Sequence, residues 1–255
     1  MTLLLIAHIV GGSLGLLGLV AAGFAKKGGT LHRRAGRVFS WAMGLTLLSG
    51  VIASLKHLLQ SQPELNLFAL LLLQAALLTG AGLDFGRLAL VAKQKSRSFS
   101  RLRSLTLPSL LALASVGLAS VSLPRGNILL TSFAALGLAL SVGQVRHWFK
   151  RDPGPKEWLV AHVSGMGTAG IGAVTAFGVV NAARLFPGVP ALVVWLLPGV
   201  LGGIWIGVVT QRLKRGNVAA SSRVADSVKS HVAQPNTSSR RKRREGSENT
   251  VSSTT

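Results

Sequence analysis

Long uncharged apolar blocks alternate with short clusters of Lys and Arg along this chain of 255 residues, and this alternation most limits its fold. A hydrocarbon core about 30 Å thick is crossed by about 20 helical residues, because each residue of an α-helix adds about 1.5 Å. Seven blocks reach or approach that length: 2–24, 38–59, 66–89, 105–123, 128–145, 158–183 and 189–210. None alternates with the period of two typical of barrel strands. The sequence therefore predicts an all-α, polytopic transmembrane helical bundle of about seven spans.

The composition agrees with lipid as the solvent for these blocks. The chain is 49% hydrophobic and 14% charged, with a mean hydropathy of +0.48, whereas a soluble domain must coat itself with polar side chains. It has no cysteine, which excludes disulfides, thiolate metal sites and a cysteine nucleophile. It also lacks the Walker and H-E-x-x-H motifs, and we leave open whether the chain is an enzyme, leaning towards no.

The basic residues predict the orientation of the spans. With the N-terminus outside, 25 of the 28 Lys and Arg fall in the first, third and fifth connections and in the tail, all on the inside. Only Lys56, Arg125 and Arg184 remain outside. Because cytoplasmic loops carry the excess of Lys and Arg, we expect an outside N-terminus and an inside C-terminus. No basic residue precedes the first block, so we expect an uncleaved anchor and not a signal peptide.

After Gln211 the chain becomes polar and basic, and it predicts two parts: a transmembrane helical domain, 1–211, and a disordered, basic cytoplasmic tail, 212–255. We expect the basic loops and the tail, with its cationic run 240–244, to attract anionic lipid headgroups of the bilayer. A solvated tail that only reinforces topology, or a tail that recruits a protein partner, stays open. No specific nucleic acid is expected, because no folded reader accompanies the run. The oligomeric state is unknown from the sequence.

Two histidines lie inside the apolar blocks, where an ionisable side chain is costly and often marks function. His8 and His162 are each followed by small residues at helical spacing: Gly11, Gly15 and Gly18 after the first, and Gly165, Ala169 and Gly172 after the second. Their helices run in opposite directions across the membrane. A true repeat would therefore be an inverted one, as in many transporters, but chance similarity of Gly-rich helices is the alternative.

Three hypotheses remain open for these histidines. The first is tight helix packing, in which each imidazole bonds to a neighbouring carbonyl or hydroxyl. The second is ligation of a metal or of a b-type haem in an electron-transfer protein, which needs one histidine from each of two facing helices. His8 would then pair with His57 near the outer face, and His162 with His32 or His147 near the inner face.

The third hypothesis is a small proton-coupled transporter with an ion path through His8, Asp84 and His162. Asp84 lies near the inner end of its helix, one turn before Arg87. The spacing of these two residues also fits a simple neutralised ion pair near the interface.

The stretch 31–39, Leu-His-Arg-Arg-Ala-Gly-Arg-Val-Phe, follows the first helix with its histidine and glycines. Together these regions resemble an uncharacterised family of bacterial multi-pass membrane proteins, in which an H-x-x-x-G helix precedes an L-H-R-x-x-G-R loop. The segment 175–181 is also similar to members of that family. The resemblance implies a multi-pass protein of the bacterial inner (plasma) membrane and no particular activity.

The basic stretch also has a direct physical interpretation. Gly28 and Gly29 permit a sharp turn after the first helix. Arg33, Arg34 and Arg37 then begin the second helix at the inner interface. These three arginines could hold a lipid phosphate, or they could simply anchor the end of the helix there.

Overall fold

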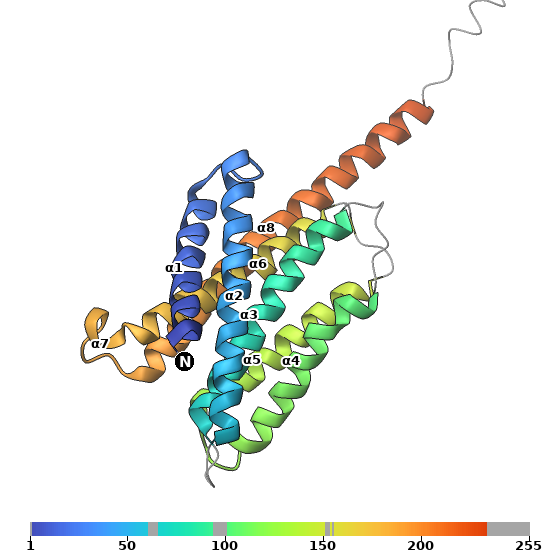
Figure 1. Ribbon diagram of the computed structural model, residues 1–255. Helices are drawn as coiled ribbons and strands as arrows, with labels where there is room; N and C mark the ends of the chain where they lie inside the picture. Colours follow the sequence, from blue (N-terminus) through green and yellow to red (C-terminus); the bar gives the residue numbers. More distant parts are fainter. Residues whose placement is uncertain (1, 61–65, 94–100, 151–153, 155, 234–255) are drawn as a thin grey trace, which may run out of the picture. The chain divides into compact units, whose positions relative to one another are not determined.

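The computed structural model describes residues 2–60, 66–93, 101–150, 154 and 156–233. Every regular element in this part of the chain is a helix (Figure 1). The elements are α1 (Thr2–Phe24), α2 (Thr30–Gln60), α3 (Leu67–Lys93), α4 (Arg101–Ser122), α5 (Ile128–Trp148), α6 (Glu157–Val180), α7 (Ala182–Leu185) and α8 (Ala191–Ala233). Seven of them are long and apolar enough to cross a membrane, and α7 is a single short turn. The all-helical class and the seven candidate spans are thus confirmed, while their orientation stays a prediction.

Several helices extend beyond the apolar blocks into the basic segments. α2 begins at Thr30 and not at residue 38, and α3 continues to Lys93. Arg and Lys are good helix formers, so a helix need not end where its apolar run ends. The sharp turn before α2 falls at Gly28, whose φ of 77° is a conformation that only glycine adopts readily. The predicted basic loop is therefore mostly the first turns of α2.

The chain divides into two compact units, Met1–Gln211 and Arg212–Thr255. α8 runs from the first unit into the second and ends at Ala233, which differs from the disorder predicted for the tail. The physical reason is local, because the sequence has no proline between Pro198 and Pro235 and is rich in Ala, Lys and Arg there. The remainder of the predicted tail, 234–255 with the run 240–244, lies outside the described residues.

Within the first unit the helices pack in pairs: α1 against α2, α3 against α6, and α4 against α5. One buried cluster joins α1, α2, α3 and α6 around Phe39, Leu83 and Ala169. A second cluster joins α3, α4, α5 and α8 around Leu71, Phe133 and Trp195, whose two aromatic rings meet edge to face. α3 belongs to both clusters and is the helix through which the two groups are connected.

Candidate functional site

The glycine faces of α1 and α6 are packed directly against other helices. A Cβ atom added at Gly18 would lie 2.8 Å from the backbone nitrogen of Phe39 on α2. One added at Gly165 would lie 2.4 Å from the backbone nitrogen of Gly86 on α3. Neither position therefore tolerates a side chain without movement of a helix. At these two positions the faces serve close backbone packing.

His8 links α1 to α2. Its Nδ1 atom lies 3.1 Å from the carbonyl oxygen of Thr46 and 2.9 Å from Oγ of Ser49. The Ser49 hydroxyl donates to the same carbonyl, at 2.9 Å. A carbonyl can only accept, so Nδ1 of His8 carries the proton and donates it across the helix interface. This arrangement matches the packing hypothesis for His8.

His57 is exposed in the last turn of α2. The ring of His8 faces Thr46, Ser49 and Gly50, and a Cβ atom at Gly50 would lie 3.6 Å from that ring. His57 lies about two turns, or about 10 Å, further along α2. The pairing of His8 with His57 around one cofactor stays a prediction.

His162 makes an equivalent bond between α6 and α3. Its Nδ1–H donates to the carbonyl oxygen of Gly86 at 2.9 Å, and Gly165 meets the same turn of α3. The pattern repeats that of α1 and α2: a histidine bonded to a carbonyl of the partner helix, followed one turn later by a glycine in backbone contact. The inverted repeat suggested by the sequence therefore has a matching contact pattern, although the repeat itself stays a prediction.

His32 lies in the first turn of α2, and its Nδ1–H donates to the carbonyl oxygen of Ala22 at 3.0 Å. His32 and His162 are close enough for their charges to interact, although they are far apart in the sequence. His8, by contrast, lies about 20 Å along α1 from Ala22. Of these two histidines, His32 is thus the one whose charge acts on His162.

The other predicted inner histidine, His147, has a different environment. Its ring meets the edge of Phe85, with 5.1 Å between centroids, and its Nδ1 lies 3.8 Å from a carboxylate oxygen of Glu157. Glu157 also accepts a hydrogen bond from Lys150 at 2.9 Å. His147 is therefore part of an aromatic and ionic cluster between α5 and the start of α6.

Asp84 pairs with a residue of another helix. A carboxylate oxygen of Asp84 lies 3.1 Å from the guanidinium of Arg103 on α4. The guanidinium of Arg87 lies over the ring of Trp41 on α2, 5.4 Å from its centroid. The spacing of Asp84 and Arg87 suggested a bond between these two. The direct contacts of the two side chains are with different neighbours, because α3 is flanked by α2 and α4, but the charge of Arg87 also acts on the Asp84 carboxylate.

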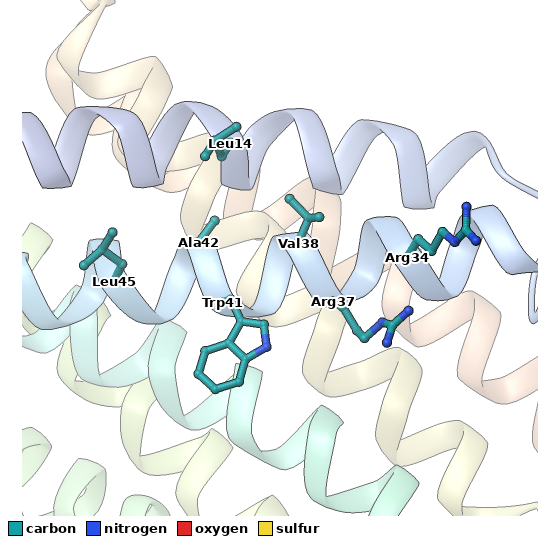
Figure 2. A pocket seen from close by; sticks show the side chains of 7 residues that line it. All are labelled: Leu14, Arg34, Arg37, Val38, Trp41, Ala42 and Leu45. Atoms are coloured by element: carbon teal, nitrogen blue, oxygen red, sulfur yellow. The ribbon is translucent and has the colours of Figure 1, made fainter.

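Of the three predicted phosphate contacts, two lie together in the structure and the third lies apart from them. Arg33, Arg34 and Arg37 all belong to the first two turns of α2 and are exposed. Arg34 and Arg37 line a groove between α1 and α2, and Arg33 is not among its lining residues (Figure 2). One helical position differs in direction by about 100° from the next, which accounts for this separation.

A polar contact deep in the bundle was missed by the sequence analysis. Gln74 on α3 is only 2% exposed, and its amide nitrogen donates to Oγ of Ser115 on α4, at 2.7 Å. The same nitrogen lies 3.3 Å from the carbonyl oxygen of Phe133 on α5. The sequence did contain a signal for this contact: the amide of Gln74 and the hydroxyl of Ser115 lie inside uncharged apolar blocks. Such polar groups often bond across helices in lipid.

The arrangement offers one pair of imidazoles for coordination chemistry. With Nδ1 donating to a carbonyl, the Nε2 atoms of His32 and His162 each keep a lone pair, as metal-ligating histidines do. Among the described residues, no three His, Asp or Glu side chains gather as a metal site. No family model, no curated protein and no solved structure matches this chain.

Proposed function

We propose that this chain is a multi-pass protein of the bacterial inner membrane that transfers electrons through a b-type haem held by His32 and His162. Two observations support the proposal: each imidazole is held through Nδ1 by a carbonyl oxygen, and the charge of His32 on α2 acts on His162 on α6. Haem sites in helical bundles are built from side chains that different helices contribute.

The donor set fits a haem better than a bare metal ion. A haem macrocycle supplies four nitrogens to its iron, so the protein needs to supply only one or two axial ligands. A bare zinc ion needs three or four protein ligands, and no such group occurs in the part of the chain that the structure describes. When bound, the haem iron would supply one-electron chemistry, with a potential tuned by its axial ligands and by burial.

The protein's own contribution is the orientation of the two rings. The carbonyl oxygen of Gly86 holds Nδ1 of His162, and the carbonyl oxygen of Ala22 holds Nδ1 of His32. Each bond selects the tautomer with its proton on Nδ1 and restrains rotation of the ring. Both Nε2 atoms are thereby kept in the form that binds a metal.

The visible spectrum of the purified protein tests this proposal. Cells expressing it with added haem precursor should yield a protein whose dithionite-reduced form has a sharp α-band. His162→Ala and His32→Ala should each remove most of that band. His8→Ala is the matched control, because His8 has the same bond type about 20 Å away and should leave the band unchanged.

Two results would contradict the proposal. One is a colourless protein that keeps its helical content, and the other is a band that survives both His162→Ala and His32→Ala. A colourless protein that also conducts protons into vesicles, with a flux lost in Asp84→Asn, would support the transporter hypothesis in its place.

The proposal also includes an outside N-terminus and an inside C-terminus, supported by the distribution of basic residues. His32 and His162 would then lie near the cytoplasmic face. A fluorescent reporter fused at the C-terminus should be bright, because it folds only in the cytoplasm, and a periplasmic phosphatase reporter there should be inactive. The opposite pair of results would reverse the proposed orientation.

A further inference from the structure

An open groove of about 630 Å³ lies between α1 and α2 (Figure 2). Leu14 of α1 lies on one side, and the remaining lining residues come from α2: Arg34, Arg37, Val38, Trp41, Ala42 and Leu45. The lining is almost wholly apolar apart from the two arginines. Trp41 is 72% exposed, although it lies within a membrane-spanning helix. Its indole therefore lines the groove and is open to the surroundings of the helix.

The two cations of the groove stand at one end of it. Figure 2 shows Arg34 and Arg37 at this end and Leu45 at the other. The arginines belong to the first two turns of α2, next to the turn at Gly28, where the membrane interface is expected. Arg87 of α3, which does not line the groove, places a third guanidinium over the ring of Trp41. The groove is thus apolar along the membrane and cationic where it meets water.

This distribution is complementary to one kind of molecule. A phospholipid has apolar chains in the hydrocarbon core and a phosphate at the interface, and its chains run roughly parallel to a membrane-spanning helix. Guanidinium groups bind phosphate through paired, charge-assisted hydrogen bonds. An anionic headgroup also retains a net negative charge, which a zwitterionic headgroup does not.

We propose that the groove between α1 and α2 is a binding site for an anionic phospholipid, with its phosphate at Arg34 and Arg37 and an acyl chain along Trp41 and Leu45. This site does not depend on the proposed haem. For Arg33, Arg34 and Arg37 the sequence left phosphate binding and helix anchoring open, and the proposal assigns phosphate binding to Arg34 and Arg37 alone. The fluorescence of Trp41 then reports whether a lipid occupies the groove.

Quenching of Trp41 fluorescence by brominated lipids tests the site. The protein is reconstituted into phosphatidylcholine vesicles that contain an equal small fraction of either brominated phosphatidylglycerol or brominated phosphatidylcholine. The signal of Trp41 is the difference between the protein and its Trp41→Phe variant, because the chain has 5 tryptophans. We expect stronger quenching of Trp41 by brominated phosphatidylglycerol than by brominated phosphatidylcholine.

Substitutions of neighbouring arginines distinguish a site from general charge attraction. Arg34→Gln and Arg37→Gln should each reduce the preference for phosphatidylglycerol by about fivefold, the factor that corresponds to one interfacial cation. Arg33→Gln is the matched control, since it removes the same charge from the same turn of α2 but lies outside the groove. It should leave most of the preference intact.

Three results would overturn the proposal. The first is equal quenching by the two brominated lipids, which means that any lipid fills the groove. The second is an equal loss of preference in Arg33→Gln, which means that total charge alone attracts the lipid. The third is no quenching by either lipid, which means that the groove is covered, for example by a second copy of the chain.

Discussion

The two helix groups that meet at α3 are held together by different kinds of contact. In the pairs α1 with α2 and α3 with α6, glycines let the backbones touch, as at Gly18 and Gly165. In the group of α3, α4, α5 and α8, larger side chains such as Leu71 and Phe133 fill the interface, and Gln74 bonds across it.

The difference shows how helices associate when lipid is the solvent. Apolar side chains gain little by leaving lipid for a helix interface, since both surroundings are equally apolar. Close van der Waals contact and bonds between polar groups then decide the association. The helix pairs α1–α2 and α3–α6 rely on close van der Waals contact at their glycines. His8 adds one hydrogen bond to the first pair, and His162 adds one to the second. The other group combines large interlocking side chains with the buried amide of Gln74.

The largest expected effect is that of a single methyl group at the crossing of α3 and α6. In Gly165→Ala the new Cβ atom would lie 2.4 Å from the backbone nitrogen of Gly86, and no side-chain rotation can relieve a clash with backbone. We expect a loss of about 3 kcal/mol in the free energy of unfolding in detergent. Gly117→Ala is the control, because a Cβ atom there meets nothing within 4 Å and alanine favours the helix. If both variants were equally stable, the glycine contact would not hold the pair together.

A smaller loss is expected when the bond of His8 is removed. His8→Ala leaves the carbonyl of Thr46 without this donor, and we expect a cost of about 1 kcal/mol in the free energy of unfolding. A double-mutant cycle with Ser49→Ala measures the coupling, because the Ser49 hydroxyl shares that carbonyl with His8. Additive effects would show that the two side chains act independently.

A still smaller change is expected in the other group of helices. Gln74→Leu removes two interhelical contacts of the amide nitrogen, but it also removes a buried amide oxygen that has no partner among the described residues. We expect the two effects nearly to cancel, with a net change of about 0.5 kcal/mol. Gln74→Ala, which leaves a cavity, should cost about 2 kcal/mol. A similar large loss in Gln74→Leu would mean that the polar bond, and not packing, holds this group together.

The smallest effect concerns the ion pair between α3 and α4. Arg103 has 65% of its side chain exposed, so its attraction to Asp84 is weakened by water. We expect Asp84→Asn to lower the free energy of unfolding by about 0.3 kcal/mol at low salt, and by less as the salt concentration rises. Unfolding of both proteins over a range of salt measures this. A large loss that salt does not reduce would indicate a buried electrostatic role for Asp84.

Much of the fold follows from the sequence because its determinants are local. A helix that spans lipid needs only enough consecutive apolar residues, and the blocks around His8 and His162 have them. The glycines after both histidines were recognisable as packing faces, because helical spacing alone places them on one side. The apolar block alone predicted the second helix only from residue 38, but the basic stretch before it was expected to form its first turns, and α2 does begin at Thr30.

The choice of partners was decided only in the tertiary structure. α6 packs on α3, although α4 and α5 lie between them in the sequence, and this pairing brings His162 to the carbonyl of Gly86. Asp84 turned to Arg103 on α4, and the groove includes Arg34 but not Arg33. The sequence determined that the chain forms seven long apolar helices, because hydrocarbon leaves a backbone few other ways to satisfy its hydrogen bonds. Which helices touch depends on fine differences in surface shape and on a few polar bonds, and these appear only once all the helices are packed together.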